Sequence, residues 1–256
     1  MKNILVPTDF SKQAQIAVDV ASDIAKQANA ELILLHVIEE ATGSSFNVEG
    51  QVSTNEESWE NRIFNMRLIE KGKTQLARLV EETKSKGIKV RQELRLGTPF
   101  HGMRTIITDR KVDLVVMGTA GHTKLEEAII GSNTEKVVRH SKCPVLTVHK
   151  KPASSDFKII VYARGMSKDE ELFARVIRKT QQLYDGTVHL VRINTPGNFQ
   201  RDAIVRKYMQ DFAKKLQLKN YTINVFNDLS EEEGIVYFAD SINADLIAMA
   251  THGRTG

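Results

Sequence analysis

The chain has 256 residues, of which 41% are hydrophobic, and this length favours two medium-sized globular domains. Its 36 basic and 32 acidic residues are interspersed, so the net charge of +4 forms no polybasic run, and aromatic residues make up only 6%. This composition argues against a nucleic-acid partner, which would need a basic stripe or a platform of aromatic side chains. The single cysteine, Cys143, excludes a disulfide framework or a cysteine-based zinc site within one chain and suits a reducing compartment.

The sequence shows neither a secretion leader nor a membrane span. Its N-terminus runs directly into a strand-like pattern, without an apolar leader and a small-residue cleavage site. No apolar stretch reaches the ~18 residues that a transmembrane helix requires. We therefore expect a soluble, cytoplasmic protein with no membrane partner.

In the first 150 residues, short apolar runs alternate with longer amphipathic runs. The apolar runs predict strands at residues 3–6, 32–37, 89–94, 113–117 and 144–148. The amphipathic runs predict helices at residues 11–28, 59–86, 99–109 and 134–140, with a long polar loop at 41–58. Continuous apolar strands separated by helices are typical of a parallel sheet that is covered on both faces.

The same pattern starts again after a linker at residues 150–156. Strands predicted at 157–161, 187–193 and 221–226 repeat the first three, and the run ADLIAMATHG at 244–253 echoes VDLVVMGTAG at 112–121. A repeat of whole-domain length indicates duplication of an α/β unit. We predict one domain at 1–149 and a second at 157–256, in which the helix and strand of 134–148 have no counterpart.

A glycine-rich segment follows the strand at 113–117. Gly118 and Gly121 are followed, after nine residues, by Gly131 and Ser132, where a helix opens. Glycine can adopt positive φ and lets the backbone approach a polyphosphate, and the free N–H groups of a helix N-terminus favour an anion. Because ligands of open parallel sheets bind beyond the carboxyl ends of the strands, this spacing predicts a phosphate-binding loop. Ordinary turn glycines are the alternative interpretation.

The glycine spacing resembles the ATP-binding signature of the universal stress protein family, which is Gly, two residues, Gly, nine residues, Gly, then Ser or Thr. The flanking segments 6–11 and 143–148 are also similar to that family, and the resemblance extends over the chain as a tandem pair. Neither a Walker A loop nor a Rossmann Gly-x-Gly-x-x-Gly is present. The resemblance implies two tandem open parallel five-stranded sheets with helices on both faces. This is the Rossmann-like fold of the adenine nucleotide alpha hydrolase type, with the second copy incomplete at its C-terminal end.

The resemblance also implies a ligand, ATP or another adenine nucleotide, with any Mg²⁺ arriving on the nucleotide. The residues expected at the adenine and ribose are Pro7, Thr8, Asp9 and Val37. Met117 and Gly118 are expected at the junction of ribose and phosphate. The residues expected at the phosphates are Gly121, Gly131, Ser132, Asn133 and Thr134. Ala120 departs from the family, in which His is common at that position.

The second half departs further from the pattern. In this alignment Tyr162 replaces Pro7, Arg164 lies about where Asp9 does, and Ala250 replaces Gly118. Because alanine disfavours positive φ, we predict that this half binds adenosine phosphates weakly or not at all.

A phosphate loop without an evident catalytic constellation predicts a regulatory, ATP-binding stress-response protein without strong catalysis. Phosphoryl transfer usually needs a positioned metal and a charge-neutralising Lys or Arg, and the sequence shows no such arrangement at this loop. Weak ATP hydrolysis is left as an open alternative. One alternative is a slow ATPase or nucleotidyl transferase that uses His122, Lys124 or Asp9. The other is a protein-interaction module with a vestigial nucleotide site. His36, at a strand end, is expected to be a packed structural residue rather than a base.

The resemblance finally implies how the chain assembles. Family members pair through the edge strand nearest the C-terminus, here residues 144–148, so the two halves are expected to form an intramolecular pseudo-dimer. An unpaired sheet edge favours association, so we also expect the chain to form homodimers.

Overall fold

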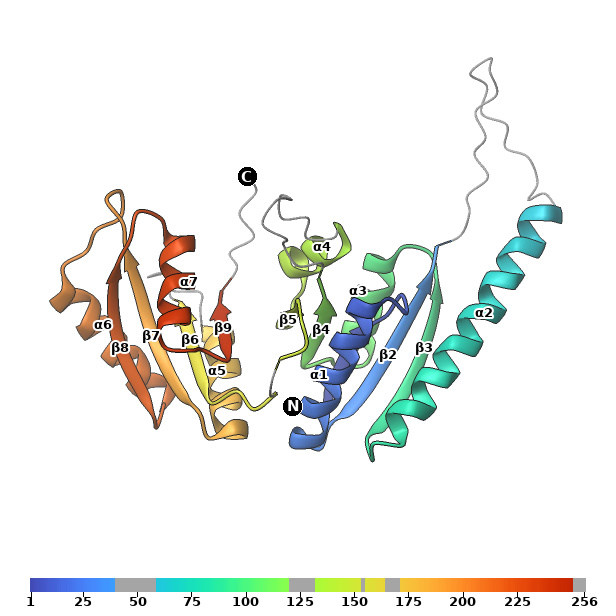
Figure 1. The fold of residues 1–256 in the computed structure, drawn as a ribbon, viewed down its shortest axis with the longest axis horizontal. Coiled ribbons are helices and arrows are strands. Elements are labelled where there is room, and N and C mark those ends of the chain that lie inside the picture. Colours follow the sequence, from blue (N-terminus) through green and yellow to red (C-terminus); the bar gives the residue numbers. More distant parts are fainter. Residues whose placement is uncertain (40–58, 120–131, 153–154, 164–170, 251–256) are drawn as a thin grey trace, which may run out of the picture. The chain divides into compact units, whose positions relative to one another are not determined.

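The computed structural model describes residues 1–39, 59–119, 132–152, 155–163 and 171–250. The chain forms two compact units, Met1–Pro152 and Ala153–Gly256, each built on one parallel sheet (Figure 1). Among the described helices, none combines the length and the apolar character needed to cross a membrane. The polar loop predicted at 41–58 lies outside the described residues.

The first unit contains a five-stranded sheet in the order β3-β2-β1-β4-β5. Its strands are β1 (Asn3–Pro7), β2 (Glu31–Ile38), β3 (Lys89–Leu96), β4 (Leu114–Gly118) and β5 (Val145–Val148). Its helices are α1 (Lys12–Ala28), α2 (Trp59–Lys84), α3 (Pro99–Asp109) and α4 (Ser132–His140). Every neighbouring pair of strands is parallel, which confirms the predicted fold class. The strand order reverses between β1 and β4, and the crevice at such a switch point is where ligands of these sheets bind.

The second unit has the same strand order with one strand fewer, β8-β7-β6-β9. Its described strands are β6 (Ile159–Ala163), β7 (Thr187–Asn194), β8 (Tyr221–Asn227) and β9 (Leu246–Met249). Its described helices are α5 (Glu171–Tyr184), α6 (Asp202–Leu216) and α7 (Glu231–Ser241). The four-stranded sheet agrees with the prediction of an incomplete second copy.

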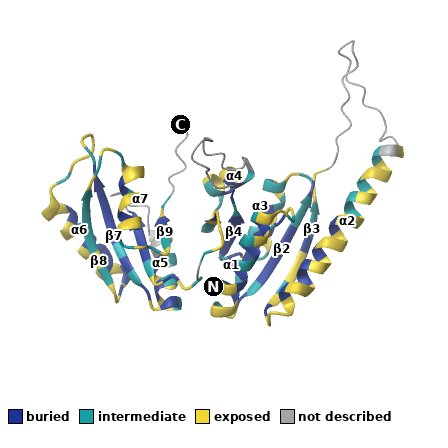
Figure 2. Ribbon diagram, in the orientation of Figure 1, coloured by how far each residue is buried: buried dark blue, intermediate teal, exposed yellow. Residues whose placement is uncertain are grey.

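The central strands are buried on both faces because helices cover the sheet on each side (Figure 2). Residues 32–35 of β2 are all fully buried. This burial on both faces explains why the sequence of this strand is continuously apolar and does not alternate between apolar and polar residues. Helix α1 begins where the Ser11 hydroxyl accepts a hydrogen bond from the backbone N–H of Ala14, at 3.2 Å. It ends at Asn29, whose left-handed backbone closes the helix.

An aspartate holds the amino edge of each sheet by the same contact. In the first unit Asp113 Oδ2 accepts hydrogen bonds from the backbone N–H groups of Lys2 (2.6 Å) and Asn3 (3.2 Å), at the start of β1. In the second unit Asp245 Oδ2 accepts from the N–H groups of Lys158 (2.9 Å) and Ile159 (2.8 Å), at the start of β6. These contacts fix the register between the two central strands of each sheet.

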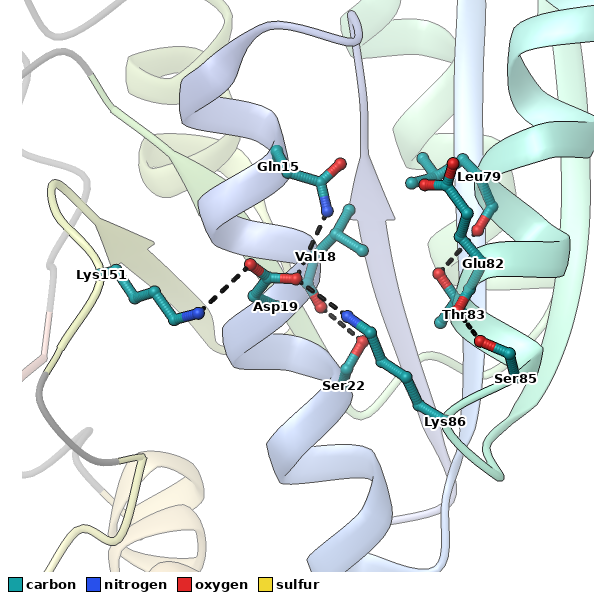
Figure 3. Close-up of polar contacts among 10 residues, drawn as sticks. All are labelled: Gln15, Val18, Asp19, Ser22, Leu79, Glu82, Thr83, Ser85, Lys86 and Lys151. Carbon is teal, nitrogen blue, oxygen red and sulfur yellow. Dashed lines mark hydrogen bonds and ion pairs between the residues drawn. The ribbon is translucent and has the colours of Figure 1, made fainter.

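A polar network joins the outer face of α1 to two later segments of the first unit (Figure 3). Asp19 Oδ1 lies 3.0 Å from Lys86 Nζ, just after α2, and Asp19 Oδ2 lies 3.7 Å from Lys151 Nζ, beyond β5. Gln15 Nε2 donates to the same carboxylate at 3.3 Å. Exposed ion pairs of this kind stabilise a fold weakly, so the network orients these segments more than it holds the core.

The aspartate contacts predict separate effects on the two units. We expect Asp113→Ala to destabilise the first unit and Asp245→Ala the second, each by about 1.5–3 kcal/mol, because each removes hydrogen bonds to a charged acceptor. Hydrogen exchange with mass spectrometry should show faster exchange in β1 for the first variant and in β6 for the second. Equal changes in both units from either single variant would contradict this assignment.

Candidate functional site

The parallel sheet brings the residues predicted at adenine and ribose to one edge. Pro7 ends β1 and pairs with Leu35, while Val37 lies one residue before the end of the neighbouring strand β2. Gly118 ends β4 on the other side of β1 and pairs with Val148. The carboxyl ends of β1, β2 and β4 therefore surround the switch point of the sheet.

The loop after β1 is shaped by its own side chains. The Thr8 hydroxyl is buried and accepts a hydrogen bond from the backbone N–H of Phe10 at 3.0 Å. Phe10 has a left-handed backbone with φ of 63°. Asp9 Oδ1 accepts from the backbone N–H of Ser11 at 2.9 Å, one residue before α1. Thr8 thus serves the turn, and Asp9 is the side chain exposed at the edge.

The carboxyl group of Asp9 is held in its ionised form. Burial raises its pKa, but hydrogen bonds from Ser11 and the nearby charge of His36 lower it, and the pKa lies below its usual value. At neutral pH Asp9 therefore presents a carboxylate, which can accept hydrogen bonds from an amine or a hydroxyl group.

His36 supports this loop from beneath. Its Nδ1 lies 2.8 Å from the backbone oxygen of Thr8, and since a carbonyl can only accept, Nδ1 carries the proton. The ring packs against Phe10 with a centroid distance of 4.5 Å. Gly72 of α2 lies on the ring so closely that a Cβ there would be 3.0 Å from His36 Cδ2. The contacts agree with the structural role predicted for His36.

Two of the predicted contact residues turn their side chains into the core. Met117 is buried in the cluster that includes Leu5 and Val137. Val37 packs against the same cluster, and a Cβ on Gly102 of α3 would lie 2.9 Å from its Cγ2. A ligand at this edge would therefore meet Met117 through its backbone atoms, whereas the half-buried Val37 keeps part of its side chain accessible.

Gly118 is needed for a different reason from the predicted one. Its φ is not positive, so the expectation of a left-handed glycine here is wrong. A Cβ at this position would lie 2.2 Å from the backbone oxygen of Gln13 and 3.1 Å from the nitrogen of Ala14, in the first turn of α1. Glycine is therefore required because helix and strand backbones approach each other directly.

The residues predicted at the phosphates are placed in part. Helix α4 begins at Ser132, with Asn133 half-buried and Thr134 buried. Gly121 and Gly131 lie outside the described residues, as does the side chain of Ser132. The structure thus places the strand end before the loop and the helix start after it, and their convergence on one anion stays a prediction. Within the described ranges, no group of three or more His, Cys, Asp or Glu side chains could hold a metal ion.

Comparison with known proteins decides the family. The model of the universal stress protein family matches residues 1–149, more than half of the chain. The chain belongs to the universal stress protein family. This finding confirms the predicted family.

Two universal stress proteins from one organism resemble more than half of the chain in sequence. Universal stress protein MJ0577 of Methanocaldococcus jannaschii is 35% identical over 156 residues, which cover 59% of this chain and 96% of the relative. Universal stress protein MJ0531 of the same organism is 34% identical over 149 residues, which cover 58% of this chain and 82% of the relative.

Two solved structures resemble this chain in fold over both of its units. A universal stress protein from Archaeoglobus fulgidus has a TM-score of 0.74 at 20% identity, covering 96% of this chain and 86% of its own. A functionally unknown protein from Pseudomonas aeruginosa PAO1 has a TM-score of 0.65 at 17% identity, covering 100% of this chain and 84% of its own. At these identities the likeness shows the fold alone.

Strand pairing aligns β6 of the second unit with β1 of the first unit one residue away from the alignment predicted from the sequence. Ile4 pairs with Leu114 in the first sheet, and Ile160 pairs with Leu246 in the second. Carried forward, this register matches Tyr162 with Val6, and Ala163 with Pro7, so the predicted match of Tyr162 with Pro7 is wrong. Tyr162 is fully buried and stacks on Phe212 at 5.8 Å. Arg164 lies outside the described residues.

A glycine inside α3 was missed by the sequence analysis. Gly102 allows α3 to lie on Val37, and Gly234 recurs at the same place in α7, where a Cβ would lie 2.6 Å from Ile193 Cγ2. Glycine in a helix interior costs stability relative to alanine, so its presence signals close packing. That signal was available in both copies of the repeat.

The close approach at Gly118 predicts a large effect of one methyl group. We expect Gly118→Ala to destabilise the first unit by about 1–3 kcal/mol, because the new Cβ overlaps backbone that cannot rotate away. Thermal unfolding measures the change. The matched control is Ala250→Gly at the corresponding position of the second unit, where we expect a loss of at most about 1 kcal/mol. Equal stability of Gly118→Ala and the natural chain would contradict the packing argument.

Proposed function

We propose that the first unit binds an adenine nucleotide at the carboxyl edge of its sheet and acts as a regulatory stress-response protein without strong catalysis. The observation that carries the proposal is the position of Asp9, in the loop just after β1, and of Gly118, at the end of the neighbouring strand β4, on either side of the switch point. The glycine signature that follows Gly118 supports a ligand with phosphates.

The residues at this edge fit the chemistry of a nucleoside. The Asp9 carboxylate is suited to accept hydrogen bonds from the adenine amine or the ribose hydroxyls. The backbone around Val37 and Met117 supplies neutral donors and acceptors for the base and the sugar. The start of α4 at Ser132 offers free N–H groups and the positive end of a helix dipole, which favour phosphate.

The proposal stops at binding and regulation. The candidate contact residues include no Lys or Arg to neutralise charge that develops on a transferred phosphoryl group. Mg²⁺ would enter with the nucleotide rather than from a dedicated site. Pairing of the two halves and self-association of the chain stay predictions.

Isothermal titration of the full chain with ATP tests the proposal. We expect saturable binding and an affinity about tenfold or more weaker in Asp9→Asn, because the charged acceptor is replaced by a neutral amide whose NH2 group cannot accept a hydrogen bond. The matched control is Asp109→Asn, an exposed carboxylate at the far end of α3, which should leave the affinity unchanged. Absence of binding by the natural chain at millimolar ATP would contradict the proposed function.

The same titration measures the number of sites. We expect one nucleotide per chain, because the second unit carries Ala250 where the first carries Gly118, and in the first unit the backbone of Gln13 leaves no room for a Cβ at that position. The Asp9→Asn variant should have a weaker affinity at that one site, and its titration should show no second site that binds ATP more tightly. A stoichiometry of two would show that the second unit binds as well and would overturn the predicted difference between the halves.

A further inference from the structure

The end of β4 is tied to the end of β5 by one side chain that the nucleotide signature does not include. The Thr119 hydroxyl lies 2.7 Å from Nδ1 of His149, the residue that follows β5. The backbone N–H of Thr119 donates to the oxygen of Val148 at 3.0 Å, so Thr119 is held by main chain and side chain together. Thr119 is buried and His149 is exposed.

The opposite side of this strand end is also fixed. Gly118 rests against the backbone of Gln13 in the first turn of α1, with no room for a Cβ. The chain therefore leaves the sheet between a rigid helix turn and the His149 ring. Residue 120 and those after it lead to the predicted phosphate loop, so the position of Thr119 sets where that loop begins.

The hydrogen bond between His149 and Thr119 can form with either neutral tautomer of the ring. Nδ1 accepts from the hydroxyl when the proton is on Nε2, and donates to the hydroxyl oxygen when it carries the proton itself. The hydrogen bond therefore forms with both neutral tautomers, so His149 can position Thr119 in either case.

We propose that His149 is a positioning residue for the phosphates of a bound nucleotide and acts through Thr119. This inference rests on the proposed nucleotide site. Thr119 follows the strand end that leads to the predicted phosphate loop, whereas Asp9 lies in the loop after β1, so His149 should affect a nucleoside polyphosphate more than a nucleoside. His149 itself need not touch the ligand.

Isothermal titration of the full chain with ATP and with adenosine tests the inference. We expect His149→Ala to weaken ATP binding by about three- to tenfold, the effect of one lost hydrogen bond, and adenosine binding by less than about twofold. His149→Asn should restore ATP binding to within about twofold, because its amide lies near the place of Nδ1. The neighbouring exposed Lys150→Ala serves as the control and should leave the ratio of the two affinities unchanged.

The outcomes separate this inference from the proposed function. If the natural chain binds no ATP, the nucleotide site fails and the inference fails with it. If ATP binds and His149→Ala matches the natural chain, the inference alone is overturned. Equal weakening of ATP and adenosine, together with a lower melting temperature, would show a merely structural residue and would also overturn it. Selective loss for ATP with rescue by asparagine supports it.

Discussion

The direct contact between the first turn of α1 and the end of β4 organises the edge of the first sheet. Gly118 meets the backbone of Gln13 without an intervening side chain. Because Ser11 caps α1 and also donates its N–H to Asp9, the same helix start fixes the loop after β1. The two strand ends that flank the switch point are therefore held by one element, and their spacing follows from backbone packing.

The candidate site is built mainly from main chain. Thr8 uses its hydroxyl within its own turn, Met117 points into the core, and the half-buried Val37 packs against the core. Asp9 is the charged side chain that faces outward. Such a site depends more on positions where two backbone segments come close than on reactive side chains. Glycine spacing was therefore more informative about this site than the presence of any catalytic residue type.

The fold could be predicted from the sequence because its central strands are continuous apolar runs and because the pattern occurs twice. The register of the second copy could not, since Tyr162 and Ala163 are both apolar strand residues and their pairing with β9 decides the alignment. The role of Gly118 was misassigned for a similar reason. The close approach of two distant backbone segments at Gly118 cannot be recognised from the residues around it. A glycine inside a helix, as in α3 and α7, is by contrast unusual for its position and can be recognised from the sequence.

The paired aspartates at the amino edges show how such a protein can diversify. Asp113 and Asp245 anchor the central strands at the edge opposite the candidate site, and they do so alike in both units. Strand alignment is thus secured independently of the residues that would touch a ligand. At the other edge the two units differ, with Gly118 in the first and Ala250 in the second, so the anchor is shared while the residue at the candidate site changes.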